Sequence, residues 1–155
     1  MNTDTIHREF LFTGIQSTTD ANSFPTDMQA MGEEAEQAGL PDRILHQQEP
    51  ECAYLIMWNW SPTERFPLMT ALAVSSADNQ PADSVTRQFP KCEYAVIPME
   101  GSVPNLVEPW PEILTWYPLD ITGFTTTIGR YNLENGTGDI LVPMTPNLAP
   151  MEGTP

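Results

Sequence analysis

Basic residues are scarce in this sequence. The chain of 155 residues contains six Lys and Arg residues against 21 Asp and Glu residues, and its formal net charge is -15 at pH 7. Lys91 is its only lysine. A protein with this charge repels the phosphate groups of nucleic acids and of anionic membranes. We therefore expect no direct nucleic-acid partner and no membrane partner, while the acidic surface could attract a basic protein partner.

The sequence also lacks the marks of an exported or membrane protein. Its N-terminus has no basic patch followed by an apolar stretch, and the longest apolar run lies around residues 53–58. This pattern predicts neither a signal peptide nor a membrane span, and we expect a cytoplasmic protein. Cys52 and Cys92 are therefore expected to be buried thiols, and with His7 and His46 they lack the short paired spacing of a zinc site. No metal and no cofactor is predicted.

What the composition does provide is enough apolar material for one domain. Hydrophobic residues make up 40% of the chain and aromatic residues 9%, which exceeds the content typical of disordered chains. A chain of this length can bury one sizeable core. We expect residues 1–145 to form a single domain and residues 146–155 to form a polar, proline-rich tail.

The first half of the chain has the pattern strand, helix, strand, strand. In the helical part, Met28, Met31 and Ala35 recur at three- and four-residue spacing, and Gly39 followed by Pro41 supplies a stop signal. The strands show alternating or β-branched and aromatic residues. The expected elements are a strand over 9–16, a helix over 25–38, a connector over 40–50, a strand over 52–60 and its hairpin partner over 68–75.

The second half repeats this order. Pro109 and Pro111 restrict the start of its helix, because proline is tolerated only in the first turn. Asn135-Gly136 predicts a tight hairpin turn whose two central residues have positive φ. The expected elements are a strand over 94–99, a turn over 101–105, a helix from Pro109 or Pro111 to Tyr117, and strands over 124–131 and 139–144.

These patterns predict an α+β fold. Two β-α-β-β repeats, over about 8–76 and 86–144, indicate a duplicated unit. Antiparallel sheets are commonly covered by helices on one face. We therefore expect duplicated β-α-β-β repeats forming an antiparallel sheet with two helices on one face and a cleft between the repeats.

Aromatic side chains are the main candidates for a binding site. Tyr54, Trp58 and Trp60 share one face of the expected strand by alternation. They form either core or a pocket wall, because two tryptophans so close are bulky for an interior that must also satisfy both indole N–H groups. Trp110 shares the apolar stripe of the second helix, whereas Trp116 lies about 120° away on an ideal helix and is the better candidate for a pocket edge.

Several stretches of the chain follow the order and approximate spacing of a known family. They are residues 94–101, residues 110–113 followed by Trp116, residues 129–131 and residues 139–143, together with an opening strand over 10–15 that ends in Gly-Ile. In these features the chain resembles the GyrI-like family. That family includes the effector-binding domains of AraC-type and MerR-type regulators and free-standing domains encoded on mobile gene cassettes.

The resemblance implies a stand-alone small-molecule (effector or drug) binding domain, with an aromatic pocket between the repeats that often accepts flat, hydrophobic cations, acting in sensing or sequestration. Family members typically carry an acidic residue two positions before the tyrosine that matches Tyr131, and this chain has Gly129 there. Glu112 and Glu100 are the nearest sequence candidates for that acid. Tyr94 and Tyr131 either satisfy nearby backbone groups or donate hydrogen bonds to the ligand.

Two other functions stay open at this point. Some relatives are hydrolases that use an acid and a tyrosine in the same cleft, an activity that Gly129 disfavours here. An acidic protein could also inhibit a nucleic-acid enzyme such as gyrase, although the carboxylates in this chain are dispersed and form no long run. The predicted ligand-binding residues are Tyr54, Trp58, Trp60, Tyr94, Trp110, Glu112, Trp116 and Tyr131, with no catalytic residue.

Overall fold

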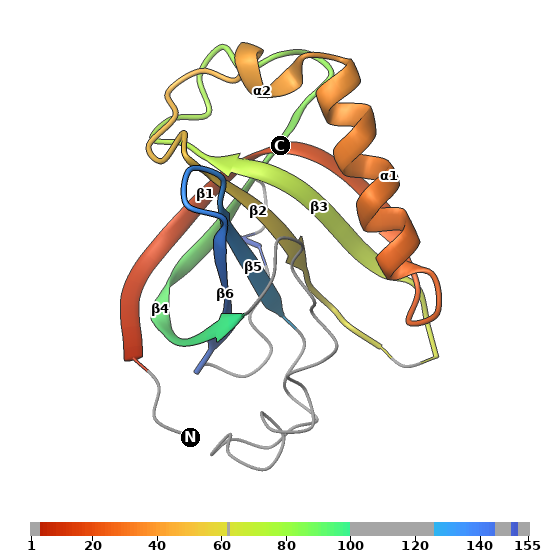
Figure 1. Cartoon of the computed structure of the whole chain (residues 1–155), viewed down its shortest axis with the longest axis vertical. Helices are drawn as coiled ribbons and strands as arrows, with labels where there is room; N and C mark the ends of the chain where they lie inside the picture. The colour runs from red at the N-terminus through yellow and green to blue at the C-terminus, as the bar shows by residue number, and fades with distance from the viewer. Residues whose placement is uncertain (1–3, 62, 100–125, 145–149, 152–155) are drawn as a thin grey trace.

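Antiparallel strands and two helices make up the part of the chain that the structure describes. The structure is a computed structural model and describes residues 4–61, 63–99, 126–144 and 150–151. This is an α+β fold, as predicted (Figure 1). The elements are β1 (Asp4–Thr19), α1 (Phe24–Gln37), α2 (Leu40–Arg43), β2 (Cys52–Met57), β3 (Phe66–Ala73), β4 (Val85–Met99), β5 (Thr127–Asn132) and β6 (Thr137–Pro143).

The strands close into a barrel in the order β1-β3-β2-β5-β6-β4. β1 is 16 residues long and pairs with β3 through residues 12–19 and with β4 through residues 4–14. β2 pairs with β5 at the other junction between the two halves of the chain. Exchanging β1 with β4, β2 with β5 and β3 with β6 reproduces the same pairs. The complete β-α-β-β repeat stays a prediction, because the expected second helix lies outside the described residues.

Aromatic side chains fill the barrel interior. Alternation along each strand sends one set of residues inward. The rings of Phe10 and Phe12 stack with centroids 5.0 Å apart, whereas other pairs meet edge-on or tilted, with centroids 4.9 Å apart for Phe12 and Tyr54 and 5.8 Å apart for Trp58 and Phe89. We call this set the interior aromatic cluster. It comprises Phe10, Phe12, Tyr54, Trp58, Phe89 and Tyr94, each at most 5% exposed.

Helix α1 covers part of the outer face of the barrel and runs beside β3 (Figure 1). Its buried residues Phe24, Met28 and Met31 belong to the same apolar cluster as outward residues of the strands. The helix has proline in its first turn and is followed by Gly39 with φ of 65°, so the predicted stop signal is confirmed. Neither described helix is long and apolar enough to cross a membrane.

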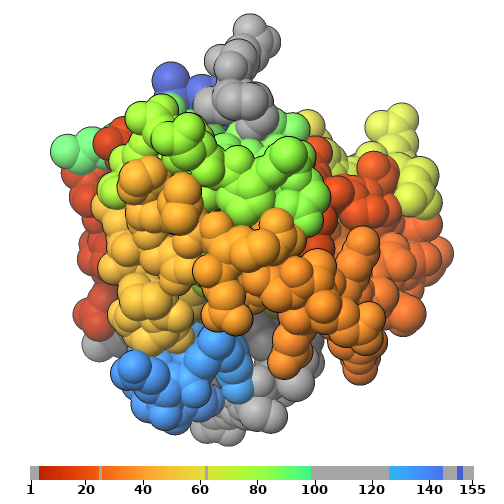
Figure 2. All heavy atoms as spheres, turned by 90° about the horizontal axis from the view of Figure 1, so that it is seen from above, coloured from red at the N-terminus to blue at the C-terminus, as the bar shows by residue number. Residues whose placement is uncertain are grey.

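The short helix α2 lies in the segment 40–50, which the sequence analysis assigned to a connector. It is held to the loop before β4, and Figure 2 shows this loop (green) beside α1 and α2 (orange) on one face of the molecule. Arg43 donates two hydrogen bonds to the Asp83 carboxylate, at 2.9 and 2.7 Å. These bonds hold the pKa of Asp83 below its usual range. This ion pair joins two residues that are 40 positions apart, so local sequence patterns do not reveal it.

Strand ends differ from the prediction where pairing partners decide them. β4 begins at Val85 instead of residue 94, because Val85 to Phe89 pair with β1. β2 ends at Met57 instead of residue 60, and Asn59 with φ of 55° then redirects the chain. Trp60 therefore leaves the inward face and packs against Phe66, with ring centroids 6.2 Å apart.

The β5–β6 turn also differs from the prediction. Gly136 has φ of 70°, whereas Asn135 is not among the described residues with positive φ, so a two-residue turn with positive φ at both positions is wrong. The last paired residues are Asn132 and Thr137, which leaves a four-residue loop. The Asn132 side-chain oxygen accepts hydrogen bonds from the backbone N–H groups of Glu134 and Asn135. These side-chain bonds stabilise the longer loop.

Gly14 allows β1 and β3 to pair closely. A Cβ added there would overlap the Thr70 carbonyl oxygen and lie 2.6 Å from the Ala71 Cα. We expect Gly14→Ala to lower the free energy of unfolding by about 2–4 kcal/mol, because backbone atoms cannot move aside easily. Gly32→Ala is the control, since a Cβ there meets nothing within 4 Å and should add up to about 1 kcal/mol through helix propensity. Urea unfolding measures both, and equal midpoints for Gly14→Ala and the parent would contradict the packing argument.

Candidate functional site

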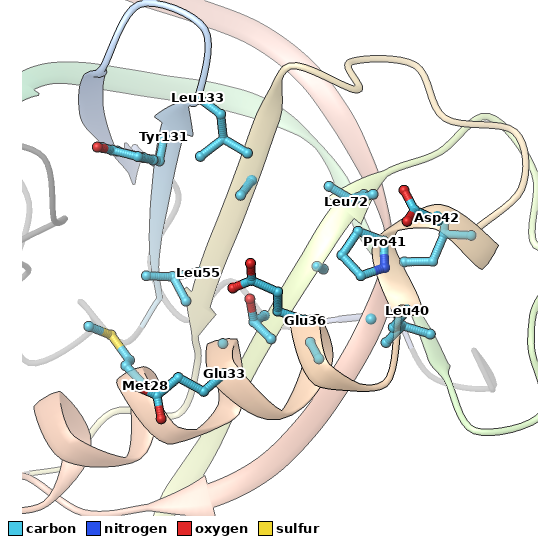
Figure 3. Close-up of a pocket in the computed structure, with 18 of the residues that line it drawn as sticks. Met28, Glu33, Glu36, Leu40, Pro41, Asp42, Leu55, Leu72, Tyr131 and Leu133 are labelled. Carbon is cyan, nitrogen blue, oxygen red and sulfur yellow. The ribbon is translucent and has the colours of Figure 1, made fainter.

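A pocket of about 810 Å³ lies between the two helices and the outer face of the sheet (Figure 3). Its volume falls within the range of small-molecule sites, roughly 300–1,000 Å³. We call it the outer pocket. Its lining includes Met28, Gly32 and Ala35 from α1, Ala53 and Leu55 from β2, Thr70 and Leu72 from β3, and Tyr131 and Leu133 from β5 and the loop after it.

Gly32 keeps the helix side of this pocket open. It lies inside α1, where glycine is less stable than alanine by about 1 kcal/mol. A Cβ at this position would contact no heavy atom within 4 Å. The missing side chain therefore leaves space that a ligand can use.

The charge of the outer pocket has one sign. Glu33 and Glu36 on α1 and Asp42 on α2 line it, and none of its described lining residues is Lys or Arg. Figure 3 shows Glu36 directed from α1 toward the strands, over a floor that includes Leu55 and Leu72. An apolar floor with carboxylates at its rim favours a ligand that is both hydrophobic and positively charged.

Tyr131 and Gly129 both lie on the side of β5 that faces this pocket. Tyr131 pairs with Ala53 of β2, and Gly129 pairs with Leu55; Ala53 and Leu55 both line the pocket. The position at which the GyrI-like family typically has its acid is therefore next to the floor, and glycine leaves it without a carboxylate. Glu36 approaches the same floor from the opposite side, on α1.

A group of polar side chains lies beside the interior aromatic cluster at one end of the barrel. The Tyr54 hydroxyl donates a hydrogen bond to Glu49 Oε1 at 3.0 Å, and Arg8 Nη1 lies 3.0 Å from the same oxygen. The guanidinium carbon of Arg8 is 4.1 Å from the centre of the Phe10 ring. Sequence reasoning missed Glu49, although its position three residues before an aromatic strand is a usable signal.

Both interior tyrosines are held in their neutral form. Burial is the main cause that raises the pKa of Tyr54, and the negative charge of Glu49 adds to it. Burial also raises the pKa of Tyr94, with a further contribution from the neighbouring Cys92 thiol. Within the described part of the chain the Tyr94 hydroxyl has no oxygen or nitrogen hydrogen-bond partner. A thiol is a weak partner, so this buried hydroxyl is poorly satisfied.

A smaller pocket of about 320 Å³, which we call the end pocket, opens at the same end of the barrel and includes Glu49 and Cys52 in its lining. Here Arg130 donates two hydrogen bonds to Asp139 across the β5–β6 pair, at 2.9 and 2.8 Å. These bonds raise the pKa of Arg130. Burial raises the pKa of the Cys52 thiol. Among the residues that the structure describes, no group of three His, Cys, Asp or Glu side chains is arranged to hold a metal ion.

The predicted ligand residues thus divide between two faces of the sheet. Tyr131 lines the outer pocket, whereas Tyr54, Trp58 and Tyr94 lie in the barrel interior. Trp60 is 37% exposed and lies beside Phe66. Three of the predicted residues, Trp110, Glu112 and Trp116, lie outside the described residues, as does Glu100.

The two interior tyrosines should make stability fall at high pH. Their pKa values in the folded state lie above the value of about 10 for unfolded chains. The folded protein therefore keeps protons that the unfolded chain releases, so this stability is complete below about pH 10 and is lost as the pH rises above it. The expected decline is up to about 1.4 kcal/mol per pH unit for each tyrosine. Urea unfolding of the parent and of Tyr54→Phe/Tyr94→Phe at stepped pH tests this, and equal slopes would contradict it.

Comparisons with known proteins agree with this architecture. SAV2435 bound to tetraphenylphosphonium has a TM-score of 0.66 at 14% identity, with 92% of this chain and 93% of that chain covered. An integron cassette protein from the mobile metagenome of Vibrio cholerae has a TM-score of 0.64 at 15% identity, with 96% and 95% covered. EcmrR in its DNA complex has a TM-score of 0.55 at 13% identity, with 92% and 56% covered.

A search of curated proteins gave no match. A family model does match, however: that of the GyrI-like small molecule binding domain aligns with residues 8–120, which is most of the chain. The aligned segment contains most of β1, helix α1 and the strands β2 to β4, which contribute to the interior aromatic cluster. This chain belongs to the GyrI-like family of small molecule binding domains.

Proposed function

We propose that this protein binds lipophilic cations in the outer pocket and acts in sensing or sequestration of such compounds. The observation that carries the proposal is an apolar floor rimmed by Glu33, Glu36 and Asp42, with no basic side chain among the described lining residues. The apolar floor supplies affinity for a hydrophobic ligand of either sign. The carboxylates select the cation, since an anion of the same shape would be repelled.

The fold comparison supports the same ligand class. SAV2435, which shares the fold, was solved with tetraphenylphosphonium, a bulky hydrophobic cation. In this chain the ring of Tyr131 offers a cation a negative π-face, and Glu36 supplies the charge that Gly129 lacks. Tyr131 lies at the β2–β5 junction, and Glu36 lies opposite it on α1. The sequence predicts a cleft between the two halves of the chain at this place.

The other predicted residues have different places in this proposal. Tyr54, Trp58 and Tyr94 face the barrel interior, so they support the pocket floor from below instead of touching a ligand in the outer pocket. Trp110, Glu112 and Trp116 stay predicted ligand contacts. Alanine substitution of each tryptophan and Glu112→Gln, measured with the same ligand, test them.

Tetraphenylphosphonium should bind with micromolar affinity, and tetraphenylborate, an anion of the same shape, should bind at least about tenfold more weakly. The reason is the sign of the pocket charge, and a tenfold difference corresponds to about 1.4 kcal/mol. Isothermal titration calorimetry at two salt concentrations measures both ions, and the preference should shrink as salt screens the rim carboxylates. Equal affinity for the two ions would leave only an apolar pocket, and no binding of either ion would remove the proposal.

Glu36→Gln should weaken tetraphenylphosphonium binding by about twofold to fivefold, as expected for one exposed charge. Glu34→Gln is the matched control, because Glu34 lies on the same helix and is exposed but does not line the pocket. Both variants change the net charge equally. An equal loss in both would show that the total charge of the protein, and not the pocket, selects the cation.

Gly32→Trp should block the outer pocket and weaken binding of both tetraphenyl ions by at least about tenfold, because the indole would occupy the open space beside α1. Ala30→Trp is the control, since Ala30 is exposed on the same helix and does not line the pocket. Circular dichroism and thermal unfolding confirm that each variant folds. Unchanged affinity in folded Gly32→Trp would place the binding site elsewhere.

A further inference from the structure

The barrel end already holds a cation, and that cation is part of the chain. Arg8 and Phe10 are two residues apart on β1, so their side chains point to the same face. The Arg8 guanidinium carbon lies 4.1 Å from the Phe10 ring centre, and its Nη1 atom lies 3.0 Å from Glu49 Oε1. An aromatic face together with a carboxylate is the arrangement by which proteins recognise guanidinium groups.

The carboxylate of this arrangement is oriented by a third residue. The Tyr54 hydroxyl donates to the same oxygen, Glu49 Oε1, at 3.0 Å. Tyr54 is fully buried and its ring packs edge-on against Phe10, with centroids 5.8 Å apart. The aromatic face and the carboxylate are therefore held in place independently of Arg8.

A second, separate observation concerns Tyr94, which lies in the same aromatic cluster as Phe10. The buried Tyr94 hydroxyl has no oxygen or nitrogen partner among the described residues. Its ring stands edge-on to Phe10, with centroids 5.4 Å apart, and the charge of Arg8 is close enough to act on its hydroxyl. Glu49 also lines the end pocket of about 320 Å³, whose described lining does not include Arg8, Phe10 or Tyr94. Arg8 and Glu49 are 30% and 23% exposed, so solvent and small solutes reach the pair.

The remaining charges of the end pocket do not compete for the same group. Arg130 and Asp139 hold each other through two hydrogen bonds. Glu51 adds a further negative charge to the lining. The group that Arg8 neutralises is therefore Glu49, and a cation that replaces Arg8 would find the same partners.

We propose that this end of the barrel is a second ligand site, specific for small guanidinium compounds, in which Arg8 is an internal cation that the ligand displaces. Phe10 supplies the aromatic face and Glu49 the counter-charge. The site lies inside the barrel end, whereas the outer pocket lies on the opposite face of the sheet. Its ligands are small and planar, and it is independent of the proposed binding of lipophilic cations.

The test uses ethylguanidinium and its neutral analogue N-ethylurea with the full chain and with Arg8→Ala. The variant should bind ethylguanidinium at least about tenfold more tightly than the parent protein, because the ligand no longer competes with Arg8. N-Ethylurea should show no such gain. Isothermal titration calorimetry measures affinity, and the rise of Tm at millimolar ligand measures the same binding through stability.

Two controls separate this site from a general effect of charge. Arg43→Ala removes the same charge from another ion pair, that with Asp83, and should bind ethylguanidinium as the parent does. Arg8→Ala/Glu49→Gln should lose the gain. Arg8→Met keeps an unbranched aliphatic side chain on the Phe10 ring and is expected to fold even if Arg8→Ala does not. It should then show a smaller gain in affinity for ethylguanidinium.

The proposal is overturned if no folded Arg8 variant gains affinity for ethylguanidinium over N-ethylurea, if Arg43→Ala gains equally, or if the double variant keeps the gain. Tetraphenylphosphonium titrated into the same variants distinguishes the two sites. Its affinity should be unchanged in Arg8→Ala, so loss of one site leaves the other measurable. A large change in tetraphenylphosphonium affinity in Arg8→Ala would show that the two sites are one.

Discussion

The double pairing of β1 is the constraint on which the rest of the structure depends. One strand of 16 residues pairs with β3 along its second part and with β4 along most of its length, and Gly14 permits the close approach to Thr70 at the place where both pairings overlap. This strand joins the two halves of the chain at one junction, and the β2–β5 pair joins them at the other. The sheet therefore has no free edge among the described strands, and it acquires two chemically different faces.

The two faces divide hydrophobic packing from recognition of charge. The interior is filled by aromatic rings, and at one end of the barrel the Tyr54 hydroxyl and Arg8 both contact Glu49. Such partners stabilise a carboxylate that is only 23% exposed, because a partly buried charge without a partner is costly. On the outer face, Glu36 and Asp42 border an apolar floor without a basic partner among the described lining residues. This imbalance is tolerable because the pocket is open to water, and it leaves the charge available to a cationic ligand.

Local sequence signals predicted well those features that depend on nearby residues. The helix stop at Gly39 is confirmed because a glycine with positive φ followed by proline ends a helix wherever it occurs. Alternation predicted that Tyr54 and Trp58 share one face, and both lie in the barrel interior, but the sequence did not distinguish core from pocket wall. Trp60 escaped that rule, because Asn59 adopts positive φ after the strand has ended. The start of β4 at Val85 could not be predicted locally, since only pairing with β1 makes residues 85–93 a strand.

The sequence by itself determined the α+β class, the family resemblance and the acidic charge, because composition, periodicity and motif order are properties of the chain alone. Only the tertiary structure decided which carboxylates matter. Glu49 and Arg8 are 41 positions apart in the sequence numbering and meet because barrel closure brings β1 beside the segment before β2. The sequence shows Glu36 only as one of several acidic residues on a helix. It lines the outer pocket because α1 lies opposite Leu55 and Tyr131. Charge and periodicity follow from the local sequence, whereas strand pairing between distant segments decides which residues lie next to a charged side chain.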